Sequence, residues 1–153
     1  MRSRTFVVVL LCFGFLACGE STSRTVEPRI RLTTPAGNAL PATLAFDPAP
    51  VGGHSDRTIR IHADTAAALE IRDIAFEAED GASAEVFAAL DVDLPLHVPA
   101  LQHRDVTLRF SPALVATYEA TLVVRSSDPA RGAVRVPVAG EGIAGRLEVS
   151  ACR

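Results

Sequence analysis

The amino-acid sequence predicts an all-β protein, an antiparallel β-sandwich of about seven strands that follows a short export leader. The first observation behind this prediction is that apolar and polar residues alternate with a period of two in several runs, as in strands with one buried face. The second is that turn-forming residues separate these runs, and no run has the period of a long helix. We expect the sandwich over residues 30–143 and a C-terminal tail over residues 144–153.

The leader, residues 1–17, has the layout of a secretory signal peptide. Arg2 and Arg4 form a positive start, and an apolar run without charge follows as far as Ala17. A transmembrane helix needs roughly 20 apolar residues, and this run is shorter. The sequence therefore predicts export and cleavage rather than a permanent membrane span.

The leader ends in Leu16-Ala17-Cys18-Gly19, which resembles the cleavage site of bacterial lipoproteins. The resemblance implies cleavage before Cys18 and attachment of acyl chains to this residue, and several chains together anchor a protein stably at a membrane. Gly19 replaces the aspartate that retains some lipoproteins at the inner membrane, so we expect the outer membrane, facing the periplasm or the cell surface. Plain secretion after a cut near Ala17 is the alternative, with the same compartment and no anchor.

Residues 18–29 are polar and without periodicity, and are predicted to be a flexible tether. The whole chain has a formal charge of −3, and cleavage would remove two arginines and no acid, so the mature protein is more acidic still. Binding of nucleic acid or anionic lipid through a basic patch needs clustered cations, whereas these arginines are scattered singly along the chain. The sequence predicts neither kind of binding.

The first strands are expected in residues 59–62 and 69–76. Within the second run, Ile74 and Phe76 resume the alternation one step out of phase with Leu69 and Ile71. A change of phase inside one strand predicts a β-bulge, here near residue 73.

The last third of the chain has the clearest pattern. Residues 106–110, 118–124 and 134–138 alternate, and the loop 126–132 contains Asp-Pro and Gly between the last two runs. These turn residues predict a β-hairpin. Pro137 has no N–H for a ladder hydrogen bond, which predicts an edge position for its strand. Residues 84–96 are compatible with a helical turn as well as a strand, and the alternation at 92–96 favours the strand.

Four segments carry a family resemblance: Phe46 with Pro50-Val51-Gly52, Val106 to Pro112, Thr117 to Leu122 with Ser127-Asp128-Pro129, and Val136 to Gly142. Together they resemble the choice-of-anchor D domain, an immunoglobulin-like module related to the Hydin-type and major-sperm-protein-like sandwiches. The resemblance implies an immunoglobulin-like β-sandwich over most of the mature chain. It implies no chemistry, because such sandwiches have many unrelated functions.

The conspicuous residues of these segments have structural explanations. Phe110 is expected to point into the core at the end of its strand. Tyr118 is expected to bury its ring and to bind a backbone group through its hydroxyl, as in a tyrosine corner. Gly140 and Gly142 are expected to adopt dihedral angles that other residues resist, where the chain leaves the sandwich.

No motif of an enzyme or a cofactor site is found. The chain lacks Gly-x-Ser-x-Gly, and the glycines of Val51-Gly52-Gly53-His54 precede a predicted strand without a following lysine. The sequence therefore predicts no enzyme and no cofactor. No metal site is predicted either, because the candidate ligands lack the spacing of a zinc or calcium site. These candidates are His54, His62, His97, His103, Glu77, Glu79, Asp80, Asp91 and Asp93.

The candidate interaction residues are Arg57, Arg60 and Arg72, which alternate outward near His62 and would form a polar face for an acidic partner, or simply a solubilising surface. The sequence thus favours a membrane-anchored, non-enzymatic interaction or structural module that contacts another envelope protein. One alternative is an envelope lipoprotein that binds a divalent ion or a glycan through its loops. A second is an accessory subunit of an envelope enzyme.

Overall fold

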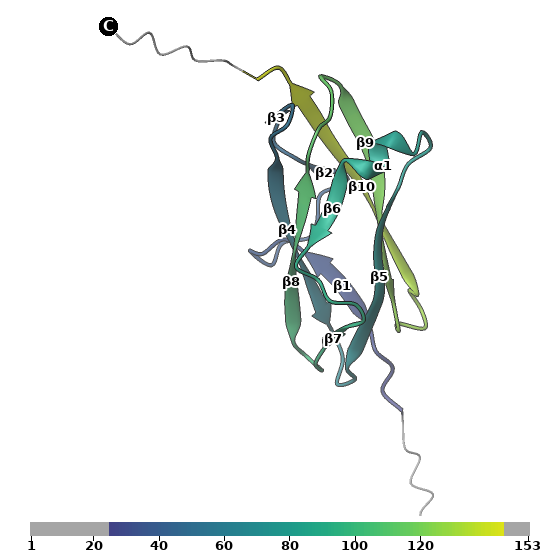
Figure 1. Cartoon of the computed structure of the whole chain (residues 1–153). Helices are drawn as coiled ribbons and strands as arrows, with labels where there is room; N and C mark the ends of the chain where they lie inside the picture. Colours follow the sequence, from purple (N-terminus) through teal and green to yellow (C-terminus); the bar gives the residue numbers. More distant parts are fainter. Residues whose placement is uncertain (1–24, 146–153) are drawn as a thin grey trace, which may run out of the picture.

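The computed structural model describes residues 25–145, which form two facing β-sheets (Figure 1). The predicted leader at 1–17, the predicted lipidation site Cys18, the tether up to residue 24 and the tail from residue 146 lie outside the described residues. The elements are β1 (Ile30–Thr33), β2 (Leu44–Ala45), β3 (Ala49–Pro50), β4 (Ser55–Ala63), β5 (Leu69–Glu77), α1 (Ala82–Glu85), β6 (Phe87–Leu90), β7 (Leu96–Val98), β8 (His103–Phe110), β9 (Thr117–Ser126) and β10 (Ala133–Ile143).

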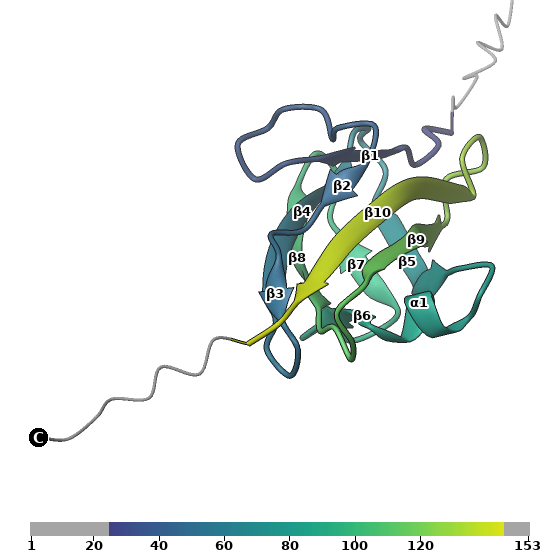
Figure 2. The same ribbon diagram turned by 90° about the horizontal axis from the view of Figure 1, so that it is seen from above.

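The smaller sheet has the strand order β1-β4-β8-β6. The larger sheet places β10, β9 and β5 side by side, with β7 at one edge and the short strands β2 and β3 at the other. Figure 2, which looks down on the sandwich, shows the two layers. Among the strands of residues 25–145, only β2 and β3 pair in parallel, both with β10. The predicted immunoglobulin-like sandwich is confirmed. The strands that the alternation did not reveal have two to four residues, too few for a repeating pattern.

The core lies between the sheets and is built by the alternating residues of the long strands. Ile59 and Ile61 on β4, Leu108 on β8, and Leu122 and Val124 on β9 are fully buried. Fully burying such side chains contributes about 1.5–3 kcal/mol each. The apolar residues at every second position of the sequence therefore form the inward face of each sheet.

Phe110 ends β8 fully buried in the core, as the sequence predicted, and there it lies at the centre of an aromatic cluster. Its ring centroid lies 5.1 Å from that of Phe87, 5.9 Å from that of Phe46 and 5.7 Å from that of Tyr118. The Tyr118 hydroxyl accepts a hydrogen bond of 2.9 Å from the backbone N–H of Leu114. The predicted burial of Tyr118 and its backbone partner are both confirmed.

The explanation expected for Gly140 and Gly142 is wrong. Both lie inside β10, and neither is among the glycines with positive φ in the described chain. Space is what requires them: a Cβ on Gly140 would lie 2.7 Å from the Phe110 ring, and one on Gly142 would lie 2.8 Å from Cβ of Pro112 and against the carbonyl oxygen of Leu114.

The prediction that the strand of Pro137 lies at a sheet edge holds for half of the strand. Along residues 133–137, β10 pairs with β9 alone. From Val138 onward β2 and then β3 pair with its other side, so this half is covered. Pro137 thus lies just before the covered half. The side of β10 away from β9 has no partner strand at this residue, so no carbonyl group lacks a donor because of the missing N–H.

The predicted bulge and hairpin are confirmed, and the ambiguous segment is resolved. The pairing of β5 with β9 shifts register between Ile71 and Asp73. β9 and β10 form an antiparallel hairpin. Residues 84–96 contain the end of α1 and the strand β6, but the strand favoured by the alternation at 92–96 is wrong, because residues 91–95 belong to no strand and β7 begins only at Leu96.

Candidate functional site

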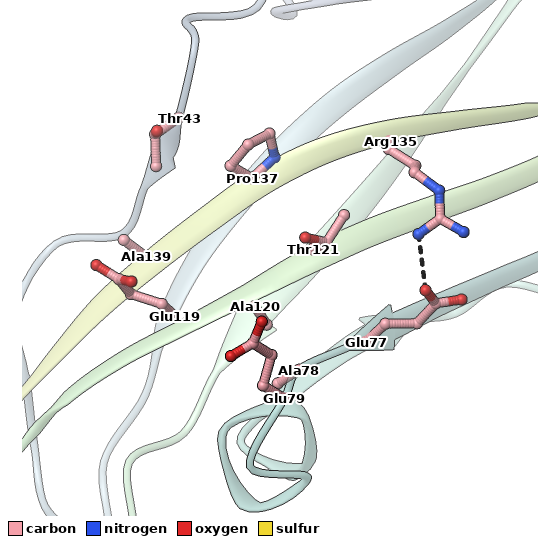
Figure 3. Close-up of a pocket in the computed structure, with 10 residues that line it drawn as sticks. All are labelled: Thr43, Glu77, Ala78, Glu79, Glu119, Ala120, Thr121, Arg135, Pro137 and Ala139. Carbon is pink, nitrogen blue, oxygen red and sulfur yellow. Dashed lines mark hydrogen bonds and ion pairs between the residues drawn. The ribbon is translucent and has the colours of Figure 1, made fainter.

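An open hollow of about 550 Å³ lies on the outer face of the larger sheet (Figure 3). It extends over β9 and β10 and is bounded by the end of β5 and the residues that follow it. Its lining residues are Thr43, Glu77, Ala78, Glu79, Glu119, Ala120, Thr121, Arg135, Pro137 and Ala139.

The strand register explains why this face is hollowed. On β9 the even-numbered Ala120 and Leu122 face the core, so Glu119 and Thr121 face outward. Their partners across the ladder are Ala139 and Pro137. Short side chains therefore form the floor, and longer charged side chains stand around it, as Figure 3 shows.

One side of the hollow is closed by an ionic network. Glu77 accepts hydrogen bonds from Arg135 at 2.7 Å and from Arg125 at 3.2 Å, and Arg125 also reaches Asp73 at 3.2 Å. The hydrogen bond from Arg135 lowers the pKa of Glu77, so this carboxylate stays ionised. These exposed ion pairs add little to the stability of the fold. Their main effect is that the charges of Arg125 and Arg135 compensate those of Asp73 and Glu77 on this side of the hollow.

The other side of the hollow is acidic. Glu79 and Glu119 form no ion pair with any residue of the described chain, and both also line a neighbouring depression of about 450 Å³ with Asp80, Ser83 and Thr117. The hydroxyl and backbone N–H of Ser83 donate to Asp80 at 2.6 and 3.0 Å and lower its pKa. We call the two depressions together the acidic hollow. Its carboxylates and threonine hydroxyls suit hydrogen bonds and ion pairs with a cationic surface.

The structure does not bring the three predicted arginines onto one face. Arg57 and Arg60 are on β4 of the smaller sheet, and Arg72 is on β5 of the larger one. Arg57 and Arg60 are also three residues apart, which directs them to opposite sides of the strand. The common polar face expected from the sequence is therefore wrong.

Each of these arginines has a carboxylate partner. Arg60 binds both oxygens of Asp105 at 2.7 and 2.9 Å. Arg57 reaches Asp47 at 2.7 Å, and Arg72 reaches Glu70 at 3.1 Å. Because their charges are compensated locally, they offer less to an acidic partner than the sequence alone indicated.

Two of the four histidines meet. His62 and His103 are directly opposed on β4 and β8, with ring centroids 5.5 Å apart, and Nε2 of His62 shares a hydrogen bond of 2.9 Å with the hydroxyl of Thr33. Partial burial, followed by the nearby charge of Arg31, lowers the pKa of His62. Within residues 25–145, no three histidine, cysteine or acidic side chains gather as a group that could hold a metal ion.

The acidic hollow was not identified from the sequence. Glu119 is one polar residue of an alternating strand, and Glu79 belongs to an acidic run that lacks the spacing of a calcium site. Forty residues separate them, and only the pairing of β5 with β9 and the turn after β5 bring them to one site. No signal in one sequence shows such a proximity.

No protein-family model matches the sequence, and no curated protein matches it significantly. Solved structures share its fold. The PapD-like domain 7 of human CEP192 superposes with a TM-score of 0.57 at 10% identity and covers 94% of this chain and 100% of that one. The periplasmic chaperone SfaE gives a TM-score of 0.52 at 7% identity, over 78% of this chain and 59% of that one.

The neighbours also include an enzyme. A family 123 glycoside hydrolase from Clostridium perfringens gives a TM-score of 0.57 at 9% identity, but the match covers 28% of that chain. Identities this low show the fold alone, and the fold does not select an activity. The chain thus has the immunoglobulin-like β-sandwich fold that these PapD-like structures share. Among the described residues, no helix is long and apolar enough to span a membrane.

Proposed function

We propose that this protein is a bacterial envelope lipoprotein, anchored through Cys18, whose choice-of-anchor D-like sandwich is a non-enzymatic docking module for another envelope protein. The observation that carries the docking proposal is the acidic hollow, in which Glu79 and Glu119 form no ion pair within the described chain. The leader ending in Leu16-Ala17-Cys18-Gly19 supports the anchor.

The hollow defines the chemistry of the partner. A lysine or arginine side chain that enters it would donate hydrogen bonds to the carboxylates of Glu79 and Glu119, which when ionised can only accept them. The loop before β9 adds apolar surface, because Leu114 and Val115 are 69% and 64% exposed. We therefore expect a partner with basic residues beside an apolar contact, recruited by electrostatic attraction that weakens with salt.

The anchor is tested by fractionation of the wild-type protein and the Cys18→Ala variant. The wild type should incorporate labelled fatty acid and sediment with membranes, whereas the variant should do neither. A wild-type protein that is found unlabelled in the soluble fraction, with its leader attached, contradicts the anchor.

The docking surface is tested by photo-crosslinking in cells. A photoreactive residue in place of Thr121 lies in the hollow, and the same residue in place of Thr107 lies on the outer face of the opposite sheet. We expect a discrete crosslinked product from position 121 only, and its loss when Glu79 and Glu119 are both changed to arginine. Equal products from both positions, or products that survive the charge reversal, would exclude the hollow as the docking site.

A further inference from the structure

The end of the sandwich where the chain enters is built from four segments far apart in sequence. The backbone N–H of Asp64 donates to the carbonyl of Arg29 at 2.9 Å, and the Thr65 hydroxyl donates to the carbonyl of Glu27 at 2.8 Å. The N–H of Leu101 donates to the carbonyl of Thr65 at 3.1 Å. The β9–β10 loop joins them through Asp128. We call this the N-terminal end, the lower end in Figure 1.

The fold gathers three arginines at this end, although they are scattered in the sequence. Arg29, Arg31 and Arg131 line a hollow of about 270 Å³. Arg31 is paired with Asp64, through bonds of 2.6 and 2.8 Å. Arg29 and Arg131 form no ion pair within residues 25–145, so their guanidinium groups are available to an anion.

The acidic groups near this hollow are largely engaged. Asp128 is 3% exposed, and its carboxylate accepts backbone N–H bonds from Ile30 at 2.9 Å, Ala130 at 2.8 Å and Arg131 at 3.0 Å. Asp105 is paired with Arg60 and Glu70 with Arg72. Glu27 is the remaining carboxylate of the described chain at this end without an ion pair. Asp64 and Asp128 remain ionised, so the three arginines that line this hollow exceed its carboxylates by one positive charge, and Arg29 and Arg131 are the two without an ion pair in the described chain. The acidic hollow extends to the start of β9 at the other end of the sandwich.

Apolar side chains project from the same end. Leu101 is 72% exposed at the tip of the β7–β8 turn, where it holds a positive φ of 58°, and Val26 is 49% exposed. A single exposed leucine is ordinary, but this one lies at the same end of the sandwich as Arg29 and Arg131, which form no ion pair within residues 25–145. Apolar side chains combined with cations are the composition of surfaces that enter the interface of an anionic membrane.

We propose that the N-terminal end is a membrane-contact surface, in which the hollow between Arg29 and Arg131 receives the phosphate of an anionic phospholipid and Leu101 enters the lipid interface. This inference rests on the proposed anchoring at Cys18. The segment from Cys18 to Thr25 can span at most roughly 25 Å, so the anchor holds this end close to the bilayer. Contact with the membrane is then intramolecular and needs little intrinsic affinity. It would direct the acidic hollow away from the membrane and toward a partner.

The chain contains no tryptophan, so a single introduced tryptophan reports its own surroundings. We compare Leu101→Trp with Leu114→Trp, a matched control on the loop that leads into β9 at the opposite end, where the leucine is 69% exposed. Both full-length lipidated proteins are reconstituted into vesicles of phosphatidylcholine with phosphatidylglycerol, or of phosphatidylcholine alone, each with brominated acyl chains as quencher. Flotation of the vesicles first establishes that the protein is anchored.

We expect quenching at position 101 in the vesicles with phosphatidylglycerol, and none at position 114. In the Leu101→Trp background, Arg29→Glu and Arg131→Glu should each shift the docking equilibrium, read from the quenched fraction, about fivefold toward the undocked state. Anchored protein with equal emission at both positions would overturn the inference and leave the proposed function intact. Quenching at position 101 that is equal with and without phosphatidylglycerol, or that is unchanged in both arginine variants, would overturn the assigned phosphate site. Protein that does not float with the vesicles would overturn the anchor and, with it, this inference.

Discussion

Replacing Gly140 with alanine should destabilise the sandwich, although it adds only one methyl group. The new Cβ would lie 2.7 Å from Cζ of Phe110 and 2.8 Å from each of its Cε atoms, whereas ordinary contacts begin near 3.4 Å. The Phe110 ring is fully buried and packs against the rings of Phe87 and Tyr118, so it has little room to withdraw. The strain must then be absorbed by the backbone of β10 or by the aromatic cluster.

The magnitude follows from two opposing effects. Overpacking a well-filled core costs about 1–3 kcal/mol. Replacing glycine by alanine stabilises by about 0.4–1 kcal/mol when the native backbone accepts it, because the unfolded chain loses freedom. We therefore expect a net loss of about 1–2 kcal/mol in the free energy of unfolding. In urea denaturation followed by circular dichroism, the midpoint should fall and the slope should stay constant.

Gly132→Ala is the matched control. A Cβ at this position has its nearest neighbour at 3.8 Å, the carbonyl oxygen of Asp128, and φ is not in the left-handed region. Its effect should stay within about 0.5 kcal/mol of zero or be stabilising. The double variant Gly140→Ala with Phe110→Leu should lose less than the sum of the single losses, since the smaller side chain relieves the clash. Equal effects of the two glycine variants, or strict additivity with Phe110→Leu, would refute the steric explanation.

Three further predictions concern single contacts. The pKa of His62 is lowered from 6.5 by burial and by Arg31, so the unfolded state binds the proton more readily. The contribution of His62 to stability should be complete above pH 6.5 and decline as the pH falls below it, and His62→Gln should flatten the pH dependence of the free energy of unfolding below pH 6.5; an unchanged slope there would contradict this. Tyr118→Phe removes the acceptor of the Leu114 N–H and should lower the free energy of unfolding, measured by urea denaturation, by about 0.5–1.5 kcal/mol. An unchanged free energy would show that water replaces the hydroxyl. Asp128→Ala leaves three backbone N–H groups without their acceptor and should cost about 1–3 kcal/mol, more than Asp128→Asn; a neutral alanine variant would show that the loop is held by other contacts.

Several elements of the sandwich could be predicted from the sequence because their signals are local. The alternation in β8, β9 and β10 reflects the two faces of each strand, and the phase change before Ile74 marked the bulge that the register confirms. Asp-Pro and Gly marked the β9–β10 hairpin. The strands β2 and β3 have two residues each, and their pairing with β10 is a tertiary contact without a local pattern.

The distinction between local sequence signals and tertiary contacts also applies to the predicted lipidation site and the two hollows. The predicted leader before Cys18 rests on one continuous run of residues, whereas the acidic hollow is composed of side chains from separate strands. The closeness of Arg57, Arg60 and Arg72 in sequence predicts a common face, whereas the turn between β4 and β5 places Arg72 on the other sheet. Arg29 and Arg131 were not grouped because they are distant in sequence, and the β9–β10 loop brings them to one hollow.

Local chemistry in the chain was thus sufficient to predict the layered β architecture and the core faces of the long strands, since hydrophobic periodicity and turn residues act between near neighbours. Tertiary structure alone decided which charges are compensated and which remain available. Cross-strand register and the packing of one sheet on the other determine whether an arginine meets a carboxylate, as Arg60 meets Asp105, or lacks an ion pair beside a hollow, as Arg29 does. Gly140 illustrates the same dependence, because its lack of a side chain matters only where β10 crosses the ring of Phe110.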